Sequence, residues 1–135
     1  MFVIGTYIIT LIIFAIIDTA WLGTMGDRIY RPLIGSMLAD KFRIGPAIIF
    51  YAMYASALTL FAVLPGFEAA DWKKALLWGG LFGLFAYATY DLTNLATLKS
   101  WSVKLVVIDI IWGVCVSAVS SALACVIALK VFSAN

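Results

Sequence analysis

Four long segments with almost no charge are the feature that most constrains how this chain can fold. We expect them to form helices over residues 2–22, 46–65, 75–98 and 103–129. A helix of about 20 apolar residues, rising 1.5 Å per residue, spans the hydrocarbon core of a bilayer. The chain is 65% hydrophobic and 12% charged, whereas soluble domains carry roughly 25% charged residues. The sequence therefore predicts an all-α, polytopic membrane protein with a single transmembrane domain over residues 1–135.

The connection over residues 23–45 has an amphipathic pattern. Its apolar side chains recur at steps of three and four, and its charges fall mostly on the other side of a helix. These apolar residues are Tyr30, Leu33, Ile34, Met37, Leu38 and Phe42. Pro32 is compatible with the first turn. We predict an interfacial helix over residues 31–42, with a plain loop as the alternative.

The Lys and Arg residues are distributed unevenly over the connections. Six of the nine lie in the first and third connections, on one side of the predicted bundle. They are Arg28, Arg31, Lys41, Arg43, Lys99 and Lys104. Because loops rich in Lys and Arg stay in the cytoplasm, we expect this side to be cytoplasmic and both termini to lie outside.

Composition also argues against several classes of protein. A formal net charge of +2 is too small to indicate nucleic-acid binding, so we expect no nucleic-acid partner. The chain has no histidine, which removes histidine-ligated haem and zinc sites and Ser-His catalytic triads. We therefore expect no cofactor.

Three acidic residues lie inside the predicted membrane segments: Asp18, Asp91 and Asp109. A charge in hydrocarbon costs about 3 kcal/mol or more, so each needs a partner, a proton or a function. Each lies one or two turns from the same end of the bundle, roughly 5–12 Å inside one leaflet. Tyr51 and Tyr54 lie at a similar depth. We predict one acidic and aromatic layer in the cytoplasmic leaflet.

Each of these aspartates lies on a row of residues spaced by four. Such rows of small residues indicate close helix contact, so we expect the aspartates to face protein rather than lipid. The rows are Gly79, Gly83, Tyr87 and Asp91, followed by Asn94; Asp109, Gly113, Ser117, Ser121 and Cys125; and, more weakly, Thr6, Thr10, Phe14 and Asp18. The same rows could equally serve a homo-oligomer.

Three interpretations of the acidic layer remain open. In the first, the aspartates only hold helices together by accepting hydrogen bonds. In the second, the layer binds a membrane lipid or a lipid-like, amphipathic small molecule, with rings on its apolar body and aspartate on its polar group. Burial favours a protonated carboxyl group, so binding would be coupled to protons. The ligand-binding residues would be Asp18, Tyr51, Tyr54, Tyr87, Tyr90, Asp91, Asn94 and Asp109.

The third interpretation is a metal-dependent enzyme acting on a membrane lipid or prenyl-phosphate substrate. Oxygen ligands suit Mg²⁺, and arginines suit phosphate. Asp18, Asp91, Asn94 and Asp109 would hold the metal, and Arg28 and Arg31 would bind the phosphate. Because no pairing of a nucleophile with a base is visible, the sequence does not decide whether the protein is an enzyme.

Three motifs resemble a family of small four-helix bacterial inner-membrane proteins of unknown function. They are Asp18-Thr-Ala-Trp-Leu-Gly, Thr89-Tyr-Asp-Leu-Thr-Asn-Leu-Ala-Thr and Asp109-Ile-Ile-Trp-Gly. The resemblance extends over essentially the full length. It implies a four-helix protein of the bacterial inner membrane, and it implies no activity. In such a membrane the charge pattern would place both termini in the periplasm.

Overall fold

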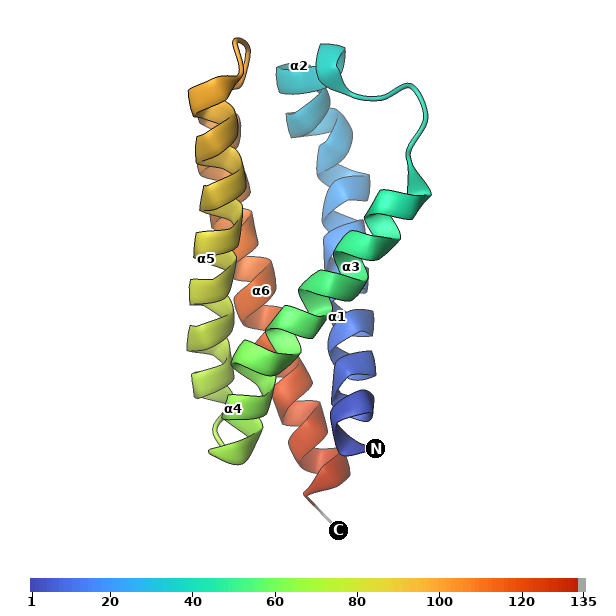
Figure 1. Ribbon diagram of the computed structural model, residues 1–135, viewed down its shortest axis with the longest axis vertical. Coiled ribbons are helices and arrows are strands. Elements are labelled where there is room, and N and C mark those ends of the chain that lie inside the picture. Colours follow the sequence, from blue (N-terminus) through green and yellow to red (C-terminus); the bar gives the residue numbers. More distant parts are fainter. Residues whose placement is uncertain (134–135) are drawn as a thin grey trace.

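The computed structural model describes residues 1–133, which form an antiparallel bundle of four long helices (Figure 1). No strand occurs within these residues. The long helices are α1 (Phe2–Met25), α3 (Ile44–Leu58), α5 (Trp72–Thr97) and α6 (Val103–Phe132), and the short helices are α2 (Arg31–Ile34) and α4 (Leu64–Glu68). The start of α1 and the end of α6 lie at one end of the bundle, and α2 lies at the other, beside the turn between α5 and α6.

Helix α1 does not stop at the membrane boundary that the sequence predicts. It continues through a π-helical turn, Gly26–Tyr30, into α2, and a 3₁₀ turn, Gly35–Met37, follows. The interfacial helix predicted over residues 31–42 is therefore shorter, because helical structure ends at Met37 and Leu38 is extended. Gly35 and Ser36 are poor helix formers, and the backbone leaves the helical region at Ile34.

The second long helix also extends beyond its predicted end. The sequence predicts a helix over residues 46–65 that ends at Pro65, but the helical path runs through this proline to Glu68. A proline inside a helix lacks one hydrogen-bond donor and crowds the carbonyl group four residues earlier. The π-helical turn Thr59–Val63 comes immediately before α4 and gives the backbone the extra width that Pro65 requires.

The bundle buries polar as well as apolar side chains, and its outer surface is rich in exposed apolar side chains. On α1, the row Thr6, Thr10, Phe14 and Asp18 is buried, which confirms that the predicted row faces protein. The opposite row, Ile4, Ile8, Ile12 and Ile16, is exposed. Soluble proteins bury such aliphatic side chains and do not leave them in long exposed rows, so the outer surface suits lipid.

Three helical stretches are long and apolar enough to cross a membrane: Phe2–Met37, Ile44–Glu68 and Val103–Phe132. Helix α5 has 26 residues but is less apolar, because it carries Lys73 and Lys74 at its start and Asp91 near its end. It packs along α6 over most of its length. The four long helices together fit a polytopic membrane protein, as the sequence predicts.

Small residues bring α5 and α6 into close contact. A Cβ atom added at Gly79 would lie 2.6 Å from the carbonyl oxygen of Ser117, and one at Gly83 would collide with the carbonyl oxygen of Gly113. Gly113 in turn lies directly against the ring of Tyr87. These contacts confirm that the two small-residue rows pack against each other within one chain. They also fix the depth at which Asp91 and Asp109 meet.

Candidate functional site

A cavity of about 450 Å³ lies at the end of the bundle where α2 crosses it. Its walls come from α1, the π-helical turn after α1, α2, α3, α5, the turn after α5 and α6. The lining residues are Asp18, Leu22, Tyr30, Ile34, Phe50, Tyr54, Ala86, Tyr87, Tyr90, Asp91, Trp101, Leu105, Asp109 and Trp112. The structure thus brings the three membrane aspartates to one cavity, at the common depth that their positions predict.

Asp18 is buried, and both of its carboxylate oxygens accept hydrogen bonds. The hydroxyl of Tyr51 donates to Oδ2 at 2.7 Å, and the indole Nε1 of Trp112 donates to Oδ1 at 3.1 Å. These donors come from α3 and α6, so Asp18 links three helices. Hydrogen bonding between helices is sufficient to explain why a carboxylate is buried at this position.

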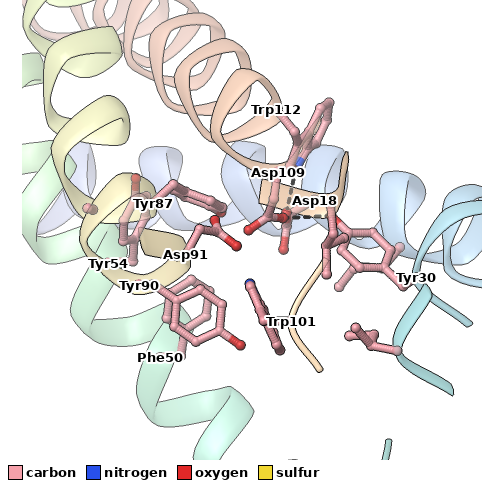
Figure 2. Close-up of a pocket in the computed structure, with 14 residues that line it drawn as sticks. Asp18, Tyr30, Phe50, Tyr54, Tyr87, Tyr90, Asp91, Trp101, Asp109 and Trp112 are labelled. Atoms are coloured by element: carbon pink, nitrogen blue, oxygen red, sulfur yellow. Dashed lines mark hydrogen bonds between the residues drawn. The ribbon is translucent and has the colours of Figure 1, made fainter. Parts of the chain in front are cut away.

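Asp109 lies beside Asp18 in Figure 2 and also accepts a hydrogen bond from a tyrosine. The hydroxyl of Tyr30 donates to Asp109 Oδ1 at 2.7 Å and accepts a bond of 3.1 Å from Trp21 Nε1. Trp21 also stacks on Trp112, with 4.2 Å between ring centroids. The two aspartates therefore belong to one network that joins α1, α3, α6 and the π-helical turn (Figure 2).

Asp91 differs from both of them. It is fully buried, yet neither of its carboxylate oxygens has a hydrogen-bond partner among the described residues. The buried indole Nε1 of Trp101 also lacks one within that part of the chain. In Figure 2 the carboxyl group of Asp91 lies beside that of Asp109, and the indole nitrogen of Trp101 points toward both; all three residues line the cavity. An unpaired buried polar group costs about 1–3 kcal/mol, so two of them facing one space need an explanation.

Aromatic rings form most of the remaining wall. Tyr54 packs edge-on against Tyr87 and its hydroxyl shares a 2.7 Å hydrogen bond with Ser117. Tyr90 packs edge-on against Trp101. Tyr90 is 57% exposed and Phe50 is 37% exposed, although both line the cavity. Because they belong to α5 and α3, the cavity opens to the surroundings between these two helices.

The structure places the predicted ligand-binding residues in two groups. Six line the cavity: Asp18, Tyr54, Tyr87, Tyr90, Asp91 and Asp109. Tyr51 lies behind the wall and holds Asp18, and half-buried Asn94 does not line the cavity. Whether the six bind a ligand stays a prediction.

The two arginines predicted to bind phosphate lie outside the cavity lining. Arg31 forms a 3.0 Å ion pair with Asp27 in which both side chains are largely exposed, and Arg28 is also exposed. Within residues 1–133 no group of three or more Cys, Asp or Glu residues is placed to hold a metal ion. Whether Asp18, Asp91, Asn94 and Asp109 can hold a metal ion stays a prediction.

Several lining residues could not be singled out from the sequence. Tyr30 belongs to the apolar stripe of the predicted interfacial helix, and only the π-helical continuation of α1 carries it over the cavity. Trp101 lies in the turn between α5 and α6, where its position is typical of an ordinary interfacial tryptophan. The sequence held no signal for Tyr30, because it lies in the predicted connection; for Trp101 the signal was a tryptophan close to the ends of two predicted helices.

The fold and the cavity define a polytopic helical membrane protein with an acidic and aromatic cavity near an end of its bundle. The chain belongs to the family described as "Predicted membrane protein (DUF2177)", whose family model matches residues 3–126. This match agrees with the resemblance seen in the sequence motifs. Neither a curated protein nor a solved structure matches the chain.

Proposed function

We propose that this protein binds a lipid-like or amphipathic small molecule in the cavity, with Asp91 as the polar contact. The observation that carries the proposal is a fully buried carboxyl group that has no partner among the described residues and lies at the wall of a cavity of about 450 Å³. Trp101 supports it, because its unpaired N–H group faces the same space. A positive or hydrogen-bond-donating group on a ligand would satisfy Asp91, and an acceptor atom on the ligand would satisfy Trp101.

The size and lining of the cavity support a small-molecule ligand. Binding pockets for such ligands measure roughly 300–1,000 Å³ and combine mostly apolar walls with a few polar groups. Here the rings of Phe50, Tyr87 and Tyr90 supply apolar surface beside Asp91. The opening between α3 and α5 faces the region that the exposed aliphatic residues mark as lipid, so a ligand could enter from the bilayer.

The proposal extends to the location of the site. The six Lys and Arg residues on the side of α2 favour a cytoplasmic location for this end of the bundle. The ligand would then enter from the cytoplasmic leaflet of a bacterial inner membrane. The alternative of a metal-dependent enzyme gains no supporting contact from the arrangement of the described residues.

Proton coupling is a further part of the proposal. Asp91 is the aspartate expected to exchange a proton on ligand binding, because Asp18 and Asp109 already accept hydrogen bonds from protein donors. The other titratable groups around the cavity are Asp18, Tyr30, Tyr54, Tyr87, Tyr90 and Asp109. Proton uptake or release on ligand addition, measured in weakly buffered solution, should be seen with the wild-type protein and lost in Asp91→Asn. An unchanged signal in that variant would contradict the role of Asp91.

Native mass spectrometry of the protein released from membranes tests the binding site. We expect a co-purified small molecule on the wild-type protein and reduced occupancy in Ala86→Phe, because Ala86 lines the cavity and a phenyl ring would take up part of its volume. Ala88→Phe is the matched control, since Ala88 is on the same helix and outside the lining. Equal ligand occupancy in the wild type and in Ala86→Phe would contradict the proposal.

A further inference from the structure

From the charges around the cavity, we propose that the ligand is an organic cation, with a single positive charge on an apolar body. This inference rests on the proposed function and specifies the class of ligand. The wall contains three carboxyl groups, on Asp18, Asp91 and Asp109, and no Lys or Arg side chain of the described residues lines it. Such a surface attracts positive charge and repels negative charge.

The location of the arginines strengthens this assignment. Arg31 is occupied by Asp27 in an exposed ion pair, and neither Arg28 nor Arg31 reaches the lining. A ligand with a phosphate or carboxylate group would therefore bring a negative charge among carboxyl groups with no cation from residues 1–133 to balance it. The donors of the described wall that no hydrogen bond occupies are neutral: the buried N–H group of Trp101 and the hydroxyls of the lining residues Tyr87 and Tyr90. Neutral donors do not balance the charge of an anionic group placed among three acids.

The aromatic wall recognises a cation as well as an apolar surface. The faces of tryptophan and tyrosine rings carry negative electrostatic potential and attract ammonium-type groups within about 6 Å. Tyr90 and Trp101 lie against each other beside Asp91, with ring centroids 5.9 Å apart. A positive group held at Asp91 would thus lie among rings, and its apolar substituents would contact Phe50 and Tyr87.

A bare metal ion suits this wall less well than an organic cation. Metal ions such as Mg²⁺ or Ca²⁺ take six or more oxygen ligands or bound waters. Both oxygens of Asp18 are already bonded to donors, and one oxygen of Asp109 is bonded to Tyr30. Asp91 is left as the free carboxyl group, which is enough for one monovalent organic cation that the rings help to hold.

Tetraphenylphosphonium and tetraphenylborate test the proposal, because they have nearly the same shape and opposite charges. Their binding to the purified, detergent-solubilised full-length protein would be measured by equilibrium dialysis. We expect the cation to bind at least about tenfold more tightly than the anion, and Asp91→Asn to remove most of that preference. Asp40→Asn is the control, since Asp40 is exposed and outside the cavity. The comparison of the two probes on the wild-type protein tests the charge preference even if Asp91→Asn does not fold.

The outcomes separate this inference from the proposed function. Equal binding of both probes, reduced in Ala86→Phe, would overturn the cationic ligand and keep the cavity as a binding site. Binding of neither probe would also overturn the cationic ligand. The native mass spectrum would then be the measurement that decides the proposed function. Cation binding that persists unchanged in Asp91→Asn would overturn the assignment of Asp91.

Discussion

At the scale of single residues, three aspartates of the same depth have different roles in the structure. Asp18 and Asp109 are bonded to donors from other elements, and Asp91 has no such donor among the described residues. The sequence predicts the common depth, because depth follows from helix rise and segment ends. The sequence cannot show which of the three aspartates has a hydrogen-bond donor, because the donors are far away along the chain. Trp112 lies 94 positions from Asp18, and Tyr30 lies 79 positions from Asp109.

This difference predicts opposite effects of the same substitution at two sites. Asp91→Leu removes an unpaired polar group, so it should raise the free energy of unfolding of the ligand-free protein by about 1–3 kcal/mol. Asp18→Leu leaves the donors of Tyr51 and Trp112 unpaired and should lower it by a similar amount. Thermal unfolding of both variants checks the signs. Destabilisation by Asp91→Leu as large as that by Asp18→Leu would mean that Asp91 only holds helices together.

At the scale of elements, the most predictable contact is the one between α5 and α6. The spacing of Gly79, Gly83 and Gly113 in the sequence alone indicates close packing, and the contacts of these glycines confirm it. The π-helical turns on either side of α3 were not predictable in the same way. No pattern in the residues of Gly26–Tyr30 or Thr59–Val63 separates these turns from an ordinary α-helix.

Alanine substitutions on α5 measure this packing. Gly83→Ala should destabilise the protein by about 1–3 kcal/mol, because the added methyl group meets the backbone of Gly113, which cannot move alone. Gly80→Ala is the matched control on the same helix, since its added atom would lie 3.4 Å from the nearest side-chain atom, on Ala118. The thermal unfolding midpoint should fall clearly for Gly83→Ala only. An equal response at both positions would argue against the close approach of α5 and α6 at Gly83.

At the scale of the whole molecule, hydrophobic composition predicts a four-helix membrane bundle and predicts little about its interior. Segment lengths set the number of helices, and the rows of residues on α1, α5 and α6 set which faces are buried. The cavity could not be predicted, because it arises where α3 diverges from α5 while α2 turns over the end of the bundle. Such divergence depends on packing between distant segments.

The charge distribution also predicts how the molecule is oriented. Ser36 is exposed on the side of α2, and Ala69 is exposed at the opposite end of the bundle. In a background without Cys115 and Cys125, a membrane-impermeant maleimide added to intact cells should label Ala69→Cys and leave Ser36→Cys unlabelled until the membrane is opened. The reverse pattern would place the cavity in the outer leaflet and refute the proposed cytoplasmic location.

The most direct test of the central claim is an experimentally determined structure of the wild-type protein in lipid nanodiscs. We expect continuous density for a small molecule in the cavity, with an atom within hydrogen-bond distance of the carboxyl group of Asp91. A structure in which side chains fill the cavity and protein donors satisfy both oxygens of Asp91 would contradict a binding site there.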